Sequence, residues 1–268
     1  MDPIYRIEHD GHPTHALRRD GTWHVLEGDP FGRYTAGARV VGPEPRVLAP
    51  VVPSKIVAVG LNYKDHAAEM HKALPDEPLI FLKPSTAVIG TGASIVIPPG
   101  AGRVDYEAEV GVVIGRTARN VPAARAHEYV LGLTCVNDVT DRDLQRRDVQ
   151  YTRAKGFDTF APVGPCIAAC DLDRPIAIES HVNGERRQHS STRELIFPIR
   201  RLVEFVTAVM TLLPGDIIST GTPPGVGPIV PGDRVVVTVE GVGELVNDVV
   251  AASEGASRID ERSRVQRR

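Results

Sequence analysis

The sequence predicts a β-rich α+β fold. Short apolar segments of strand-like composition recur along the chain, separated by turn residues such as Gly, Pro, Asn and Asp. The clearest helical spacing of apolar side chains falls in residues 198–213. The sequence lacks the regular alternation of strand and helix that is typical of doubly wound folds. Together these observations favour packed sheets accompanied by a few helices.

Composition and charge argue against several classes of protein. The chain has 268 residues, a hydrophobic fraction of 42% and a net charge of −3, which do not favour binding to nucleic acid or anionic membranes. No apolar run reaches the roughly 18 residues that span a bilayer. The first residues, MDPIYRIEHD, lack the layout of a signal peptide, and the three cysteines do not form an even framework. We therefore expect a cytoplasmic protein with reduced thiols and no nucleic-acid or membrane partner.

The chain is predicted to contain two domains and a tail. Residues 1–50 are expected to form a small N-terminal β domain, because residues 4–26 form strand-like segments joined at Asp10-Gly11 and Asp20-Gly21. Residues 27–53 are rich in Gly and Pro and are interpreted as a connection. The catalytic domain is expected over residues 51–251. Residues 252–268 are almost free of apolar side chains and are predicted to be a flexible tail.

Alternation and turn signals place further elements within residues 51–251. Asn183-Gly184 marks a hairpin between two strand-like segments. Asn120 is expected to cap a helix over residues 121–129, with Pro122 in its first turn. Other helices are predicted over residues 63–70, from residue 141 onward and over residues 198–213. Strands are predicted over residues 55–60, 78–84, 93–98, 106–115, 129–140, 216–220, 234–240 and 244–250.

The segment RVDYEAEVGVVIG places three acids at two-residue spacing within an apolar strand. Residues i and i+2 of a strand point to the same face, so Glu107 and Glu109 project together, and Asp105 is on the same face. Asp138 ends another apolar strand and offers a third carboxylate. Three hard oxygen ligands favour Mg²⁺ or Mn²⁺ over Zn²⁺. The alternative is a strand with a solvated acidic face.

His66 and Glu69 form a second candidate site in the segment NYKDHAAEM. If this segment is helical, the two side chains lie at i and i+3 and meet on one face. A carboxylate beside an imidazole orients the ring and supports its role as a general base. The alternative is an exposed helix with an incidental pair.

Two lysines and one loop complete the candidates. Lys83 and Lys155 lie in apolar surroundings beside turn residues, where each could supply positive charge to an anionic ligand or extend to solvent from the surface. The Gly- and Pro-rich segment 219–227 follows a strand and could present Thr222 to a carboxylate. It has no Walker lysine and therefore is not a phosphate-binding loop.

Seven stretches, in order along residues 55–250, resemble the fumarylacetoacetate hydrolase family. Within that family they resemble the acylpyruvase-like and the 2-hydroxyhepta-2,4-diene-1,7-dioate isomerase-like members. The N-terminal fifty residues also resemble the small domain of many bacterial members. The seven stretches are VAVGLNYKDHAAEM, PLIFLKPST, VDYEAEVGVVIG, VNDVTDRDLQ, AKGFDTFAPVGP, VNGERRQ and LLPGDIISTGTPPGVG.

The resemblance implies a catalytic domain built as a mixed β-sandwich or β-roll, a homodimer and a role for each matching residue. The implied metal ligands are Glu107, Glu109 and Asp138, with Mg²⁺ or Mn²⁺ as the metal and Ca²⁺ as a further candidate. The implied catalytic residues are His66, Glu69 and Lys155, of which the first two activate water. The implied substrate-binding residues are Lys83, Gln145 and Thr222.

The resemblance also indicates a lid and two departures. The segment from Met70 to Pro78 matches a stretch that closes over ligand. Asp141 stands where many members have Ala, which adds an acid near the site. No equivalent of the fourth carboxylate of the large hydrolases is evident, so we expect three protein carboxylates, with water or substrate completing the shell. The resemblance does not make Asp105 a ligand, so it is expected to be a solvated acid or a neighbour of the ligands.

Together these features predict an enzyme that acts on a small anionic 2-oxo acid. We expect hydrolytic cleavage of a C–C bond in an acylpyruvate or a related β-diketo acid, through an enolate. The alternative activity is isomerisation or decarboxylation of a 2-hydroxydienoate or β-keto dicarboxylate from aromatic catabolism. An alternative from another class is a non-catalytic binding protein that kept the fold.

Overall fold

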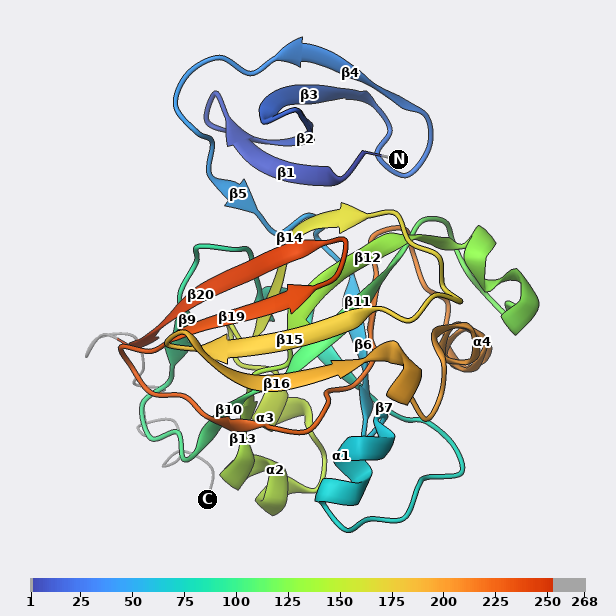
Figure 1. Cartoon of the computed structure of the whole chain (residues 1–268), viewed down its shortest axis with the longest axis vertical. Coiled ribbons are helices and arrows are strands. Elements are labelled where there is room, and N and C mark those ends of the chain that lie inside the picture. The colour runs from blue at the N-terminus through green and yellow to red at the C-terminus, as the bar shows by residue number, and fades with distance from the viewer. Residues whose placement is uncertain (1, 253–268) are drawn as a thin grey trace, which may run out of the picture.

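The computed structural model describes residues 2–252, and its largest element is a long mixed sheet (Figure 1). Most of its strand pairs are antiparallel, whereas β17 (Ile217–Ser219) runs parallel to β6 (Lys55–Gly60). The strands lie in the order β4 (Tyr34–Arg39), β3 (Thr22–Gly28), β2 (His12–Arg19), β1 (Ile4–His9), β14 (Ala161–Ala168), β12 (Val130–Asn137), β11 (Ala108–Ile114), β17 (Ile217–Ser219), β6 (Lys55–Gly60) and β7 (Leu79–Pro84), with β5 (Val47–Leu48) beside β1 and β8 (Val88–Ile89) beside β14.

Two smaller sheets accompany the long one. The first contains β16 (Glu185–Ser191), β15 (Ala177–Val182), β19 (Arg234–Val239), β20 (Gly243–Ala251) and β9 (Ile95–Ile97). The second contains β13 (Thr140–Asp141), β10 (Val104–Tyr106) and β18 (Gly227–Pro228).

The main hydrophobic core lies between the long sheet and the five-stranded sheet. Val110 and Leu133 of the long sheet belong to the same buried cluster as Ile178 and Val237 of the five-stranded sheet. Apolar faces of two sheets that pack on each other remove both from water, which is the main stabilising term of such a fold. This arrangement confirms the predicted β-rich α+β class with its mixed sandwich.

The first three strands form the predicted meander. Asp10-Gly11 and Asp20-Gly21 both have positive φ at each residue, the backbone that two-residue hairpin turns require. The meander joins the rest of the long sheet where Ile4 pairs with Ile167. A domain boundary at residue 50 stays a prediction.

The interpretation of residues 27–53 as a plain connection is wrong. The segment contains β4 and β5, which pair with β3 and β1. Its many Gly and Pro residues hid these strands, since β4 itself includes Gly37. A Cβ at Gly37 would meet the end of the exposed Glu27 side chain at 2.3 Å, so that side chain would have to move to admit a larger residue.

Four α-helices and three 3₁₀ turns occur among the described residues. They are α1 (Lys64–Glu69), α2 (Arg142–Asp148), α3 (Thr152–Lys155), α4 (Ile199–Val209), η1 (Ser85–Ala87), η2 (Ala123–Glu128) and η3 (Thr192–Glu194). Helix α4 buries Leu202, Val203 and Val206 in the main core, as its apolar spacing predicts. It ends four residues earlier than expected, because Met210 is extended and Leu212 forms a β-bridge with Ala118.

The predicted helix over residues 121–129 is a shorter 3₁₀ turn, and Asn120 does not cap it. Asn120 has a φ of 50°, and its N–H donates to the carbonyl of Thr207. Pro122 occupies the position before the turn, with no side-chain cap. The hydrogen bonds from this segment to Thr207 of α4 therefore outweigh the local preference of Asn120 for capping.

Two further predictions concern the ends of the chain and membranes. The predicted tail falls almost entirely on residues 253–268, which lie outside the described residues. Within residues 2–252, no helix has the length and apolar character to cross a membrane.

Candidate active site

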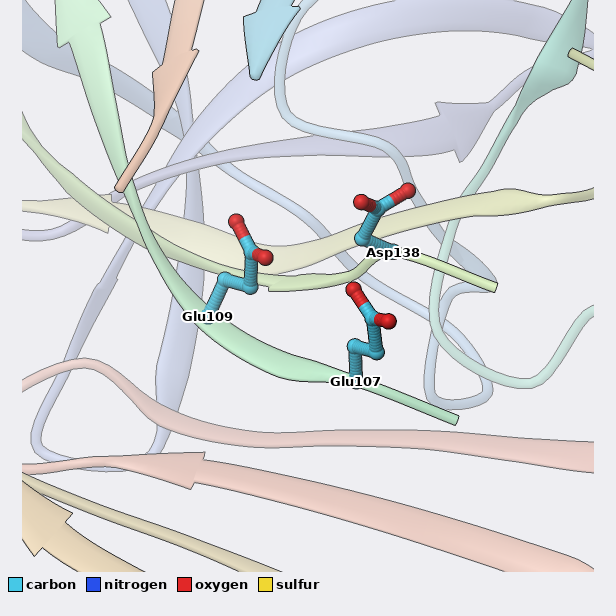
Figure 2. A group of neighbouring side chains, drawn as sticks. All are labelled: Glu107, Glu109 and Asp138. Carbon is cyan, nitrogen blue, oxygen red and sulfur yellow. The ribbon is translucent and has the colours of Figure 1, made fainter. Parts of the chain in front are cut away.

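Three buried carboxylates meet where two neighbouring strands of the long sheet reach the same end. Glu109 lies in β11, Glu107 immediately precedes that strand, and Asp138 immediately follows β12 (Figure 2). The register places Ala108 opposite Asn137, and the Asp138 N–H donates to the Glu107 carbonyl at 2.8 Å. One oxygen of each carboxylate lies within 4.8 Å of the others. The structure thus brings together the three predicted ligands.

Asp105 is separated from this cluster by a break in the strand. β10 ends at Tyr106 and belongs to the three-stranded sheet, whereas β11 begins at Ala108 in the long sheet. Asp105 is buried, so it is not a solvated acid. It accepts from Nε of Arg142 at 2.8 Å, and Arg142 also pairs with Glu107. Asp105 therefore neighbours the ligands through this arginine.

Positive charges stabilise the ionised form of Glu107. Burial alone would raise the pKa of this carboxyl group, but Lys155 and Arg142 outweigh it and lower the pKa to about 2. The Lys155 ammonium lies 3.0 Å from Glu107 Oε2. Glu107 is consequently a carboxylate ready to accept a cation at neutral pH.

Glu109 has the opposite electrostatic environment. Burial raises its pKa well above the usual value, and the charges of Asp138 and Glu107 raise it further. Its Oε2 accepts from Ser219 Oγ at 2.6 Å and from the Gly221 N–H at 2.9 Å, which fix the direction of the carboxyl group. Crowded carboxylates of this kind are relieved when a cation lies between them.

Two lysines contact the two oxygens of Asp138. Lys155 donates to Oδ2 at 2.5 Å and to Thr140 Oγ1 at 2.7 Å. Lys83 donates to Oδ1 at 2.5 Å and to the Val139 carbonyl at 3.3 Å. Lys155 lines the cavity described below, whereas Lys83 is fully buried and is not among its lining residues. Lys83 was predicted to bind substrate, but the structure places it against Asp138, one of the three carboxylates, and outside the cavity wall.

The pKa values of the two lysines move in opposite directions. Burial would lower the pKa of Lys155, but Asp138 and Glu107 outweigh it and raise the pKa above the usual value. Burial dominates at Lys83 and lowers its pKa, despite the attraction of Asp138.

The donor set fits a divalent cation. All three groups are carboxylates, which suit Mg²⁺, Mn²⁺ or Ca²⁺ better than a soft metal. A divalent ion would leave the three carboxylates and the ion with a net charge of −1, and Lys83 and Lys155 offset it. Glu107, Glu109 and Asp138 could therefore hold such an ion.

The predicted His66–Glu69 pair forms on α1. Nδ1 of His66 lies 2.8 Å from Glu69 Oε2, and the other oxygen of Glu69 accepts from the Gly225 N–H at 3.2 Å. The His66 side chain is mostly buried, and both residues line the cavity.

A cavity of about 650 Å³ connects the carboxylates with the His66–Glu69 pair. Its wall includes eight of the nine predicted site residues, Lys83 being the exception. Figure 1 shows α1, α2 and α3 gathered at the same end of the molecule, where they supply much of this wall. Met70, Lys72 and Pro75 of the predicted lid also line the cavity, and closure of that lid stays a prediction.

Gln145 and Thr222 both line the cavity, but their polar groups are already engaged. Gln145 accepts from Arg142 Nη1 at 2.8 Å. The Thr222 hydroxyl donates to the Ala108 carbonyl and accepts from Gln188 Nε2 at 2.8 Å. Binding of a substrate by either side chain would replace or share these bonds.

Arg142 and Gln188 make contacts at the candidate site that the sequence reasoning missed. Arg142 links Glu107, Asp105 and Gln145, and Gln188 holds the Thr222 loop against β11. The available signal for Arg142 was its place right after Asp141, which caps α2 by accepting from the Asp143 and Leu144 N–H groups. Asp141 thus contributes to the site by capping α2, the helix that carries Arg142.

Comparisons with known proteins identify the family of the chain. The family model "Fumarylacetoacetate (FAA) hydrolase C-terminal" matches residues 55–250. Protein Rv2993c of Mycobacterium tuberculosis is 47% identical over 245 residues, which are 90% of each chain. The solved structure of 5-carboxymethyl-2-hydroxymuconate delta-isomerase from Mycobacterium smegmatis is 45% identical, with a TM-score of 0.87 over 93% of this chain and 100% of that one.

A hydrolase has the same architecture. The fumarylacetoacetate hydrolase of the psychrophile Exiguobacterium antarcticum is 32% identical, with a TM-score of 0.84 over 94% of this chain and 100% of that chain. The family match and these identities, together with the carboxylate cluster, show that this chain belongs to the fumarylacetoacetate hydrolase family and is an enzyme.

Proposed function

We propose that the protein hydrolyses a C–C bond in an acylpyruvate or a related β-diketo acid. The observation that carries this proposal is a single cavity lined by His66 and Glu69, by the three carboxylates and by Lys155. Hydrolysis requires a base for water and a positive group for the electrons of the broken bond, and this cavity offers both.

The charge of the cavity favours an anionic substrate. Five cationic side chains line it, namely Lys72, Arg103, Arg142, Arg146 and Lys155, against the carboxylates of Glu69, Glu107, Glu109 and Asp138. A divalent ion would add two positive charges and, when bound, would act as a Lewis acid toward a substrate carbonyl. The proposed substrate is accordingly a small 2-oxo acid.

The side chains suggest how the reaction proceeds. His66, oriented by Glu69, takes a proton from water as the water oxygen bonds to the carbonyl carbon two atoms from the keto group. The bond between that carbon and the methylene carbon then breaks, and its electron pair forms an enolate. The Lys155 ammonium stabilises the enolate charge, and protonated His66 returns the proton to the methylene carbon. The products are a carboxylic acid and pyruvate.

A second candidate function is isomerisation or decarboxylation of a dienoate or β-keto dicarboxylate. It is favoured by the isomerase from Mycobacterium smegmatis, which has nearly half of its residues identical to this chain. Both reactions need the group that stabilises an enolate, but neither needs attack by water. Family membership argues against a non-catalytic binding protein.

Water labelling separates these candidates. Purified protein with Mg²⁺ or Mn²⁺ would be incubated in H₂¹⁸O with acylpyruvates, oxaloacetate and 2-hydroxyhepta-2,4-dienedioate. We expect one ¹⁸O atom in the acid released from an acylpyruvate, and we expect His66→Ala to slow release at least about 100-fold with little change in Mn²⁺ affinity. Turnover of the dienedioate alone, without label, would replace hydrolysis by isomerisation. Equal loss of activity and Mn²⁺ binding in His66→Ala would make His66 structural.

A further inference from the structure

The position of α1 depends on contacts from other parts of the chain. The helix has six residues, and no side chain caps its N-terminus. A helix this short is not stable by itself, so tertiary contacts decide where it lies. The segment before it is fixed by Asn62, whose side chain bonds the Phe197 N–H and the Thr220 carbonyl at 2.8 Å each.

Asp65 joins His66 to a strand of the five-stranded sheet. Its Oδ1 accepts from the backbone N–H of His66 at 2.9 Å, and its Oδ2 accepts from Ser190 Oγ at 2.7 Å. Ser190 lies in β16, whose position is set by the register with β15 and by Gln188, a buried side chain with four hydrogen bonds. One carboxylate therefore ties the peptide of His66 to a rigid strand.

The other end of α1 has a tie of its own. Glu69, which orients the His66 ring, also accepts from the Gly225 N–H. His66 consequently lies between the Asp65–Ser190 contact and the Glu69–Gly225 contact. The Glu69 contact cannot be removed without disturbing the ring, whereas the Ser190 contact can.

We propose that Ser190 is a positioning residue that, through Asp65, holds α1 so that His66 faces the carboxylate cluster. The Ser190 hydroxyl touches neither the cavity nor the reacting groups. Its hydrogen bond to a charged acceptor fixes the backbone from which the imidazole projects, and loss of such alignment lowers kcat rather than affinity. The kinetic part of this inference rests on the proposed function.

Ser190→Ala tests the proposal, with Ser190→Thr as the conservative rescue. We expect Ser190→Ala to lower kcat about tenfold, in line with a hydrogen bond to a charged group, with KM changed less than about twofold and Mn²⁺ affinity unchanged. Ser190→Thr should keep wild-type kcat, because threonine retains the hydroxyl and suits a strand. The matched control is Ser191→Ala, since the Ser191 hydroxyl accepts from the Arg193 N–H and caps η3 instead.

A double-mutant cycle and a spectrum complete the experiment. Asp65→Ala combined with Ser190→Ala should be no slower than Asp65→Ala alone. In ¹⁵N spectra of the Mg²⁺-loaded protein, the His66 ring signals, assigned with His66→Ala, should move in Ser190→Ala but not in Ser190→Thr or Ser191→Ala. The spectra stay informative even if the proposed substrates are not turned over, which separates failure of this inference from failure of the function.

Two results would overturn the inference. One is a Ser190→Ala protein with unchanged His66 ring signals. The other is an equal loss of kcat in Ser190→Ala and Ser191→Ala, which would indicate a general effect on β16.

Discussion

The Lys83 ammonium lies 2.5 Å from Asp138 Oδ1, and both side chains are buried. Lys155 contacts the other oxygen of the same carboxylate. Each oxygen of Asp138 therefore accepts a hydrogen bond from a lysine. Lys155 lines the cavity, and Lys83 does not. This contact places Lys83 against the Asp138 carboxylate and outside the wall of the cavity, whereas the sequence predicted that it binds substrate.

Replacement of Lys83 by Met should destabilise the metal-free protein more than the metal-loaded protein. Removal of one partner leaves the buried Asp138 charge less compensated, which costs about 3 kcal/mol of unfolding free energy. A bound divalent ion restores positive charge at Asp138, so Mn²⁺ should raise the free energy of unfolding more in Lys83→Met than in wild type. Urea unfolding with EDTA and with Mn²⁺ measures both. The exposed Lys72→Met is the control, and an equal loss under both conditions would refute the prediction.

Val149 to Gly should stabilise the protein. Val149 has a φ of 63° and is the central residue of a tight turn in which the Gln150 N–H donates to the Asp148 carbonyl. A β-branched residue is strained in this region, and relief contributes about 1 kcal/mol. The side chain is 77% exposed, so little packing is lost.

Val41 to Gly is the matched control for that substitution. Val41 is also exposed but does not have a positive φ, so glycine should lower stability slightly by loosening the unfolded chain. Thermal unfolding of both variants gives the comparison. A lower Tm for Val149→Gly than for wild type would show that the turn is not strained.

Stability should fall in acid partly through Asp216. Burial would raise the pKa of this carboxyl group, but bonds from the Leu213 N–H, from Lys55 and from Ser54 outweigh it and lower the pKa below the usual value. A lowered folded-state pKa stabilises the protein fully above the unfolded value, near 3.9. This contribution is lost as the pH falls through the folded pKa.

Asp216→Asn tests the sign of this effect. At pH 7 the variant should unfold about 2 kcal/mol more easily, because bonds to a charged acceptor are lost. The difference from wild type should shrink as the pH falls below about 4. Urea unfolding across pH 3–7 measures it, with the exposed Asp76→Asn as control. A difference that grows toward low pH would contradict the account.

Local sequence patterns were sufficient for the parts of the site that depend on strand direction. Two-residue spacing predicted that Glu107 and Glu109 share a face, and i, i+3 spacing predicted the His66–Glu69 contact. The same alternation misled at Asp105, because the chain changes sheets at Glu107. A change of sheet depends on partners far along the sequence, which no local period contains.

Residues whose roles depend on distant partners were harder to predict. In the sequence, Arg142 is one charge among several in a charged helix, and nothing local shows that it joins Asp105 to Glu107. Asn120 is a residue type that favours helix N-caps, but the hydrogen bond of its N–H to the Thr207 carbonyl decided its conformation. In each case tertiary contacts outweighed a local preference.

Mn²⁺ titration of wild type and Glu109→Gln by calorimetry tests the central claim most directly. The account predicts one ion per wild-type chain. It also predicts affinity at least about 100-fold weaker in Glu109→Gln, since loss of a ligand should exceed the 10–100-fold cost of losing an outer partner. Circular dichroism and the remote, exposed Glu244→Gln serve as controls for folding and charge. Equal Mn²⁺ affinity in wild type and Glu109→Gln would contradict a metal centre at Glu107, Glu109 and Asp138.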